Sequence, residues 1–515
     1  MGVKKQIHGL LGALSEKVEA LGKKRIGQRR FSRAYGRRTY AAAAYDRLSK
    51  DWRFPETTAD VELYAALRIL RGRSRELHRN DDYFRRFVNM LKTNVIGHEG
   101  IRLQAGYRKK NGKDPDLDSI KKVESAFKKW GKRKNASVCG TMSLWATACQ
   151  VAERWAVDGE VLVQLLPGWD NAFGFATKVI EADQLDLMKN EVLPNSNVIT
   201  MGVEKTSYGK PVAYHILSSH PGNSTHQNQG VVSERIDARY ILHIFQKNRP
   251  DQSRGEPIVV SAMRRLRQLG AYEEAELVAS RIGASKMGFY KTSEGGEFGD
   301  DLVDEEGNPI EKSKDFATTA EPGTFEVLPD GYDFVSWDPQ HPNSSFGDFS
   351  KSILRGVSSG FNVSYVGLSN NLEGVSYSSI RSGEMSDRDA WRVIQKMFVE
   401  QFYEEIFQEW LPIAIASGAL DLPMSAKDKW ADVSWQPRGW GWVDPDKEIK
   451  AKERSVSNSF ESLYDVVAET GRDLDDVLEA NARARDRAKD LGLKLPVFEG
   501  IKNETNSGPN QEPAN

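Results

Sequence analysis

The stretch GEPIVVSAMRRLRQLGAYEEAELVASRIGASKMGFY, residues 255–290, decides the fold because it predicts a helix suited to close packing. Small side chains recur in it at every fourth position, a spacing that places them on one stripe of a helix. A second helix can approach such a stripe closely. The stripe consists of Ala271, Ala275, Ala279 and Gly283.

A second helix with the same spacing is predicted at 344–362, where Gly356 and Gly360 are four residues apart. The segment between the two helices, 291–343, begins with nine acidic and only three basic residues over 291–315. The turn sequence EGNP at 306–309 indicates a solvated hairpin there. Its central acids are Asp300, Asp301, Asp304, Glu305 and Glu306.

The segment that follows the second helix, 363–383, is rich in glycine, serine and asparagine. It contains too few apolar side chains to form a core element, so we expect a mobile loop. A long helix is predicted at 384–411, with an apolar stripe from Trp391 to Trp410 and Pro412 just beyond its end.

The part before residue 255 predicts an α+β domain. Apolar spacing indicates two helices over 60–96, the second of them capped by Asp81 or Asp82, and further helices at 113–134 and 141–157. Short apolar runs with turn-rich links indicate strands at 160–166, 175–180, 211–217 and 240–245.

The C-terminal part predicts an aromatic strand at 430–442 and then two helices. The first helix is expected to begin at the pair Asp444 and Pro445 and to run to about Thr470, where Gly471 ends it. Asp473 is expected to cap the second helix, which ends near Leu491. Residues 494–515 are polar and are expected to be disordered.

The bulk composition indicates a globular chain without a strong overall charge. The 515 residues include 72 basic and 73 acidic side chains, so the net charge does not mark a nucleic-acid-binding protein. No apolar run approaches the roughly 18 residues that a membrane helix needs. The two cysteines, Cys139 and Cys149, are expected to be buried small residues of a protein made in a reducing compartment.

The N-terminal segment 1–40 is the one strongly basic region, with eleven lysines and arginines against two glutamates. A flexible, solvated arm is one interpretation. Transient binding to DNA or to a scaffold protein is the other.

Enzyme motifs are weak in this sequence. The sequence GVSSG at 356–360 matches a hydrolase nucleophile motif, but helical spacing surrounds it where a strand and a sharp turn are required. His215, His220 and His226 lack the helical spacing of a metal-binding pair. No phosphate-binding GxxxxGK[ST] sequence occurs. We therefore expect no catalytic residues, no metal and no cofactor.

Several long strings resemble the portal proteins of tailed bacteriophages, of the lambda type. The resemblance extends from about residue 41 to about residue 493. Its strings are ELVASRI at 276–282, EPGTFE at 321–326, HPNSSFGDF at 341–349, LRGVSSG at 354–360, GVSYSSIRSG at 374–383 and WVDPDKEIKA at 442–451.

The resemblance implies a dodecameric ring at one vertex of a capsid, through which a separate terminase drives double-stranded DNA. It implies an α+β portal fold, with a wing at 41–256, stem helices at 257–290 and 344–362, a clip at 291–343 and a tunnel loop at 363–383. A long wing or spine helix and a strand would occupy 384–443, and crown helices would occupy 444–493.

The implied partners are the terminase large subunit, capsid and scaffold proteins, and head-completion proteins, with docking at the clip acids. The resemblance places the protein in the virion, and in the host cytoplasm during assembly. Polar side chains of the tunnel loop could touch phosphates, or they could only cap helices or bond between subunits. They are Asn370, Asn371, Tyr377, Ser378, Ser379 and Arg381. A metal-dependent nucleic-acid-processing enzyme and another capsid component are the alternatives.

Overall fold

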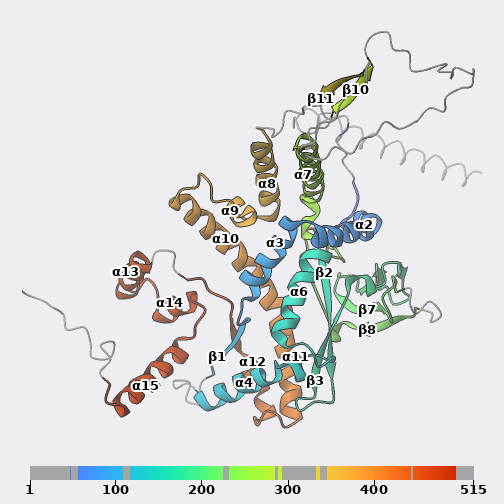
Figure 1. Cartoon of the computed structure of the whole chain (residues 1–515). Helices are drawn as coiled ribbons and strands as arrows, with labels where there is room; N and C mark the ends of the chain where they lie inside the picture. Colours follow the sequence, from blue (N-terminus) through green and yellow to red (C-terminus); the bar gives the residue numbers. More distant parts are fainter. Residues whose placement is uncertain are drawn as a thin grey trace, which may run out of the picture. The chain divides into compact units, whose positions relative to one another are not determined.

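The computed structural model describes residues 56–107, 116–223, 231–284, 288–292, 332–336, 345–441 and 445–493, together with Arg47 and Asp51. The chain divides into two units, Met1–Thr58 and Ala59–Asn515. Every element below belongs to the second unit (Figure 1). The basic segment 1–40 and the tail 494–515 lie outside the described residues.

Two helices open this unit, α2 (Ala59–Asn80) and α3 (Asp82–Leu91), and a π-helical turn, η2 (Lys92–Ile96), continues the second. Asp81 caps α3, as predicted, by accepting a hydrogen bond from the backbone N–H of Phe84 at 2.7 Å. Phe84, Phe87, Val88 and Leu91 then form a fully buried face. These helices pack against α6 (Leu144–Asp158), which Ser143 caps.

A three-stranded antiparallel sheet follows α6, with β2 (Glu160–Pro167) between β3 (Phe175–Ile180) and β9 (Ile241–Phe245). These strands agree with the predicted runs. A five-stranded antiparallel sheet was only partly foreseen, because just its strand β7 (Pro211–Leu217) was predicted. The other strands are β4 (Glu191–Val192), β5 (Val198–Thr200), β6 (Val203–Lys205) and β8 (Ser233–Asp237).

A two-stranded pairing joins β1 (Arg102–Ala105) to β12 (Val433–Gln436), although more than three hundred residues of chain separate them. The predicted strand at 430–442 was too long, since α12 (Lys427–Ala431) occupies its beginning. Beside β1 lies α4 (Leu117–Trp130), and the short α5 (Arg133–Ala136) after it contacts β3. The predicted helix at 113–134 therefore breaks at Gly131.

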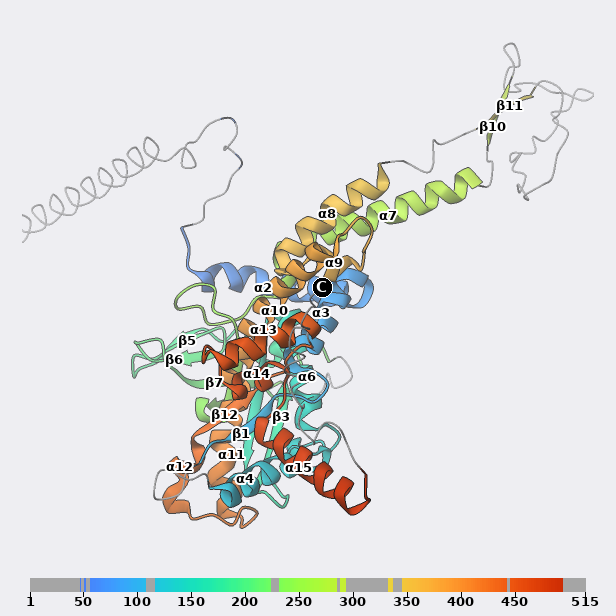
Figure 2. The same cartoon turned by 90° about the vertical axis from the view of Figure 1, so that its left-hand side faces the viewer.

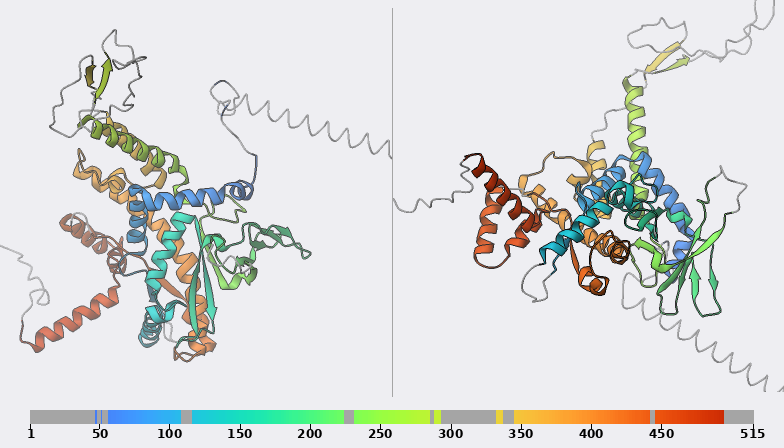
Figure 3. Two further views of the ribbon diagram at one scale, coloured as in Figure 1. Left: turned by 45° about the vertical axis from the view of Figure 1, so that its right-hand side comes forward. Right: turned by 90° about the horizontal axis from the view of Figure 1, so that it is seen from below.

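The two helices of the predicted stem are α7 (Met263–Ala284) and α8 (Phe346–Phe361), and they lie side by side in Figures 1 and 2. The 3-10 turn η6 (Ile258–Ser261) precedes α7. Between the two helices, β10 (Gly288–Thr292) pairs antiparallel with β11 (Tyr332–Ser336), which supports a hairpin base. Near its beginning, α7 is crossed by α2, as the left view of Figure 3 shows.

The prediction of one loop over 363–383 was wrong in its secondary structure. Residues Tyr365–Ser369 form α9, and α10 (Tyr377–Phe398) begins seven residues before the predicted helix start. The helix then continues through a π-helical turn, η7 (Val399–Tyr403), into α11 (Glu404–Ala416). Pro412 lies inside α11 and does not end it.

The C-terminal region holds three helices where two were predicted: α13 (Pro445–Ser457), α14 (Leu463–Glu469) and α15 (Leu474–Asp490). The extra break occurs at Ser462, whose side chain forms a reciprocal capping box with Asp465. Asp473 caps α15, as predicted.

The largest core cluster contains an aromatic group where α4, α11 and β12 meet. Phe127 contacts Trp130, Phe407, Trp410 and Trp435, with ring centroids 5.1 to 5.8 Å apart. Edge-to-face contacts of this kind stabilise beyond their buried area. Among the described helices, none is both long enough and apolar enough to cross a membrane.

Candidate channel segment and stem

The two glycines of α8 face the beginning of α7. A Cβ atom on Gly360 would lie 3.0 Å from Oγ of Ser261, and one on Gly356 would overlap the guanidinium end of Arg265. The backbone of α8 therefore approaches η6 and α7 at a distance that a side chain would prevent. The predicted role of these two glycines in packing between stem helices stays a prediction.

The small-residue stripe of α7 behaves differently. Ala271 and Ala275 are exposed in the single chain and Ala279 is half-buried, so the stripe is not covered by α8. At this level Tyr272 contacts α8 instead, with its ring centroid 5.4 Å from that of Phe346 and 5.1 Å from that of Phe349. Within this single chain the α7 stripe is therefore not covered, and its role in helix packing stays a prediction. The surroundings of Gly283 lie outside the described residues.

The segment after α8 is anchored at its beginning by Asp387 of α10. One carboxylate oxygen accepts the backbone N–H of Ser364 at 2.7 Å, and the other accepts its hydroxyl at 2.6 Å. The same hydroxyl caps α9 by accepting the N–H of Gly367. Burial raises the pKa of Asp387, against the effect of the bonds from Ser364. These contacts fix where the segment leaves α8.

A second anchor comes from α3. The guanidinium of Arg86 donates to the carbonyl of Gly367 at 2.8 Å and to the side-chain oxygen of Asn370 at 3.4 Å. Asn370 itself ends α9 in the left-handed region, with φ of 57°, a conformation that asparagine tolerates well. Asn370 thus has a structural role in this chain, and its contact with phosphates stays a prediction.

Asn371, Ser378 and Ser379 also have internal partners. The side-chain oxygen of Asn371 accepts the N–H of Glu373 at 2.8 Å, which closes a local turn. Ser376 caps α10, and its hydroxyl lies 3.0 and 2.9 Å from those of Ser378 and Ser379. The cap of α10 is thus Ser376, and the roles of Asn371, Ser378 and Ser379 toward DNA stay predictions.

Arg381 and Tyr377 lie on the first two turns of α10. Arg381 forms an ion pair at 3.3 Å with Glu448 of α13, so its side chain links α10 to the C-terminal helices. Tyr377 is 58% exposed. The predicted docking acids Asp300, Asp301, Asp304, Glu305 and Glu306 lie outside the described residues.

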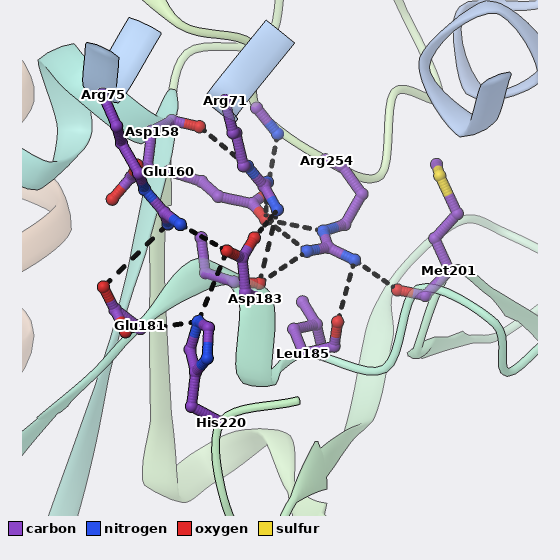
Figure 4. A network of polar contacts seen from close by, with 12 residues as sticks. Arg71, Arg75, Asp158, Glu160, Glu181, Asp183, Leu185, Met201, His220 and Arg254 are labelled. Carbon is purple, nitrogen blue, oxygen red and sulfur yellow. Dashed lines mark hydrogen bonds and ion pairs between the residues drawn. The ribbon is translucent and has the colours of Figure 1, made fainter. Parts of the chain in front are cut away.

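The strongest polar feature of the molecule was not foreseen from the sequence. It is a buried ionic network around Glu160, at the point where the chain leads into α7 (Figure 4). The carboxylate of Glu160 accepts from Arg71 at 2.5 Å, from Arg254 at 2.6 Å and from the backbone N–H of Gly255 at 2.7 Å. His243 lies 2.9 Å from its other side. Burial alone would raise the pKa of Glu160, but Arg254, Arg71 and His243 hold that pKa well below its usual range.

Arg254 is completely buried and uses the rest of its guanidinium on backbone carbonyls. It donates to the carbonyls of Ala182 at 2.9 Å and Met201 at 2.7 Å. A second layer surrounds this centre, in which Arg75 pairs with Asp158 at 2.6 Å and with Asp183 at 2.5 Å. The network thus joins α2, both sheets and the segment before α7 into one body.

A backbone contact reinforces this junction. Gly159, with φ of 86°, lies so close to the chain at 255–257 that a Cβ atom there would meet the carbonyl carbon of Glu256 at 2.1 Å. The sequence signal for the whole junction was a glutamate opening an apolar strand and an arginine followed by glycine. Neither is specific enough to be recognised without the fold.

The candidate enzyme residues show no catalytic arrangement in the described part of the chain. Ser358, the serine of GVSSG, lies inside α8 and donates to the carbonyl of Leu354 at 2.9 Å. His215 lies 3.7 Å from Glu204, and His226 is outside the described residues. In the same described part, no group of three metal-ligating side chains comes together.

The expectation of two buried cysteines was wrong for Cys139, which is exposed, while Cys149 is half-buried. Hydrogen bonds from Ser137 and Thr141 lower the pKa of the Cys139 thiol to about 7. The short turn before α6 leaves this side chain at the surface, which the sequence pattern did not indicate.

Comparison with known families gives the class of this protein. The model of the phage portal protein, lambda family, matches residues 45–395. The chain therefore belongs to the lambda family of phage portal proteins, and it is a portal protein of a phage-like particle.

Individual relatives agree with this assignment. The chain is 34% identical over 467 residues to a probable portal protein of Halomonas phage phiHAP-1, covering 90% of this chain and 89% of the relative. It is 19% identical over 486 residues to portal protein B of Escherichia phage lambda, covering 87% and 89%. Among solved structures, a chain in the neck of an empty GTA particle is 12% identical, with a TM-score of 0.41 over 82% of this chain and 96% of that one. A likeness at this level adds nothing to the assignment.

Proposed function

We propose that this portal protein assembles as a closed ring, dodecameric by its resemblance to the family, around a channel for double-stranded DNA. A terminase would drive the DNA inward through this channel, and head-completion proteins would attach to the ring afterwards. The protein would be part of the virion at one capsid vertex, after assembly in the host cytoplasm. It would catalyse no reaction itself.

The observation that carries the ring is the exposed alanine stripe of α7. Alanines at four-residue spacing leave a shallow groove along a helix, and Ala271 and Ala275 keep that groove open because α8 packs elsewhere. In a ring, α8 of the neighbouring subunit would fill it. The same stripe in a monomer would remain exposed for no structural reason.

The regions are proposed as follows. Residues 41–256 form the wing, α7 and α8 the stem, and 291–343 the clip that docks the terminase and the connector proteins. The long helix α10 to α11 is the spine, and α13 to α15 form the crown. The Glu160 network supports this division because it ties the wing to the root of α7.

The channel-facing part of the segment 363–383 is proposed to be its tip between α9 and α10. Asp387 and Arg86 fix the beginning of the segment, whereas Leu372 and Tyr377 are 60% and 58% exposed. Contacts from this tip to DNA would be weak and independent of sequence, because phosphates are met without base edges. Such contacts allow the duplex to slide.

The ring is tested by changing Ala275 to leucine. This substitution places bulk on an exposed surface of the single chain, so the fold should survive while the interface between subunits is blocked. Ser280→Leu, on another exposed face of α7, is the matched control. Light scattering and negative-stain images should show rings for the wild type and the control, and smaller species for Ala275→Leu. Rings of unchanged mass in Ala275→Leu would reject the stem interface.

The alternative of a metal-dependent enzyme is tested on the same samples. A homogeneous monomer of the wild type that degrades DNA only with a divalent metal would reject the portal assembly and favour that enzyme.

A further inference from the structure

The two outer strands of the three-stranded sheet carry exposed charge of opposite sign. These strands are β3 and β9, because β2 lies between them. The short helix α5 contacts β3, and the π-helical turn η7 contacts β9. Exposed basic side chains gather at the β3 edge, and exposed acidic side chains gather at the β9 edge. The two edges are therefore electrostatically complementary surfaces of one chain.

The β3 edge is basic. A single bridge between Ser137 and Thr177 joins the chain after α5 to β3. The residues just before Ser137 and just after Thr177 include four exposed cations that form no ion pair within the described residues. Lys128 and Lys129 also lie near but belong to the last turn of α4, where the helix dipole favours cations. The basic edge therefore consists of Lys132, Arg133, Lys134 and Lys178.

The β9 edge is acidic. The side chain of Gln401 in η7 accepts the backbone N–H of Phe245 at 3.2 Å, which places the junction of α10 and α11 beside β9. Farther along α11, Glu409 forms an ion pair at 3.1 Å with Arg239, just before this strand. Three further carboxylates near Gln401 are exposed. The acidic edge consists of Glu400, Glu404 and Glu405.

The acidic edge is not neutralised within the single chain. In the part of the chain that the structure describes, Glu404 and Glu405 form no ion pair, and Glu400 has only Lys396 at 3.8 Å. Both members of that pair are exposed, and such pairs contribute little. Burial raises the pKa of Glu405, and the charges of Glu404 and Glu409 raise it further. Like charges therefore repel one another at this edge.

A second copy of the chain is the partner that fits both edges. In a closed ring the subunits associate head to tail, so that one side of each subunit faces a different side of the next. The basic edge and the acidic edge lie at opposite edges of one sheet. Contact between them would relieve the repulsion at both, because opposite charges across an interface attract and like charges oppose association. DNA or an acidic protein would neutralise the basic edge alone.

We propose that the basic edge of each subunit binds the acidic edge of the next copy in the ring. This contact rests on the proposed ring, and it is separate from the alanine stripe of α7. Because the two edges differ in sign, the contact favours head-to-tail association and opposes the meeting of two like edges.

Charge reversal in the full-length protein tests this contact. E400K/E404K/E405K makes both edges basic, and K132E/R133E/K134E makes both edges acidic, so neither variant has complementary edges. An equal mixture of the two variants restores complementarity at every contact of a ring in which they alternate. R68E/R73E/R79E, which reverses three exposed arginines of α2, is the matched control. Light scattering and negative-stain images measure assembly, and circular dichroism establishes that each variant is folded.

The wild type and the control should form rings. Each reversed variant alone should need about tenfold more protein, or more, to assemble. The equal mixture should assemble like the wild type, whereas a mixture of E400K/E404K/E405K with the control should not recover.

The other outcomes separate this contact from the ring itself. Rings of both reversed variants at the wild-type concentration would overturn the contact and leave the proposed ring intact. Loss of rings without recovery in the equal mixture would show that the two edges do not face each other. An equal loss in the control would mean a general charge effect and would also reject the contact. If K132E/R133E/K134E kept its rings but no longer bound a labelled DNA duplex, the basic edge would be a nucleic-acid contact instead. A wild type without rings would reject the ring and this contact together.

Discussion

Replacing Glu160 by glutamine tests whether the buried ionic network holds α2 and the two sheets to the segment before α7. The substitution keeps the size and shape of the side chain and removes only its charge and one acceptor. One oxygen of Glu160 faces Arg71 and Arg254, and the other faces His243 and the N–H of Gly255. The side-chain oxygen of glutamine can still accept hydrogen bonds from Arg71 and Arg254. Its NH2 group would then face the N–H of Gly255, so two donors would meet without an acceptor.

The size of the effect follows from this geometry. An unsatisfied buried donor costs about 1 to 3 kcal/mol. Removing one member of a buried ion pair, which leaves two guanidinium groups without their carboxylate, costs about 3 to 5 kcal/mol. The carbonyls around Arg254 and the contact of Arg71 with Asp183 compensate in part. We therefore expect Glu160→Gln to lower the free energy of unfolding by about 3 kcal/mol.

Urea unfolding at low protein concentration, followed by tryptophan fluorescence, measures this difference in the free energy of unfolding. The midpoint of Glu160→Gln should shift to lower urea, and its slope is compared with that of the wild type. Glu409→Gln is the matched control, since it removes the partner of Arg239 in an exposed ion pair. It should leave the midpoint within experimental error. Equal stabilities for Glu160→Gln and Glu409→Gln would refute the reasoning that the network stabilises the junction.

The pH dependence gives an independent reading of the same carboxylate. Because the pKa of Glu160 is held well below its usual range in the folded chain, its stabilisation is present above the usual value. It is lost only as the pH falls through the lower, folded-state pKa. The difference in the free energy of unfolding between the wild type and Glu160→Gln should therefore disappear in strongly acidic solution. A constant difference between pH 7 and that acidic range would contradict the assignment.

Two further substitutions probe single contacts. Gly159→Ala should destabilise the fold by several kcal/mol, because the φ of Gly159 is positive and the new Cβ would overlap the backbone of Glu256. Thermal unfolding measures this effect. A variant that unfolds near the wild-type temperature would exclude the close contact. Asp387→Ala should speed hydrogen exchange of the amides at 364–371. Asp387→Asn should not, because asparagine keeps an acceptor for the N–H of Ser364. Equal exchange rates in the two variants would contradict the anchoring role of Asp387.

The sequence predicted most helices and the strands of the central sheet because these elements follow from local rules. Asp81 and Asp473 cap their helices through contacts three residues or fewer away, and those contacts are visible in the sequence order. The predicted helix end before Pro412 was wrong. A proline inside a helix costs about 3 kcal/mol and therefore normally ends it. Leu411 and Ala414 on either side of it are buried, and their burial holds the helix together through the proline.

The candidate channel segment shows the limit of composition as a guide. Serine and asparagine in this segment predict a loop, yet Ser364 and Ser376 begin helices and Asn370 ends one. The same residue types serve both purposes, since they bond to nearby backbone groups in either setting. Which purpose applies depends on Asp387 and Arg86, which come from other parts of the chain. Long-range partners of this kind cannot be identified from local sequence.

The position of the ionic network suits a protein whose stem would bear force along its length. A strand junction held by apolar packing alone can slide by small steps, because dispersion contacts have little direction. Glu160 and Arg254 instead fix the chain by directed bonds just before η6 and α7, where the backbones at Gly159 and Gly255 approach each other closely. Motion of the stem would then be passed to the wing as rigid rotation, and flexibility would be confined to the tip between α9 and α10.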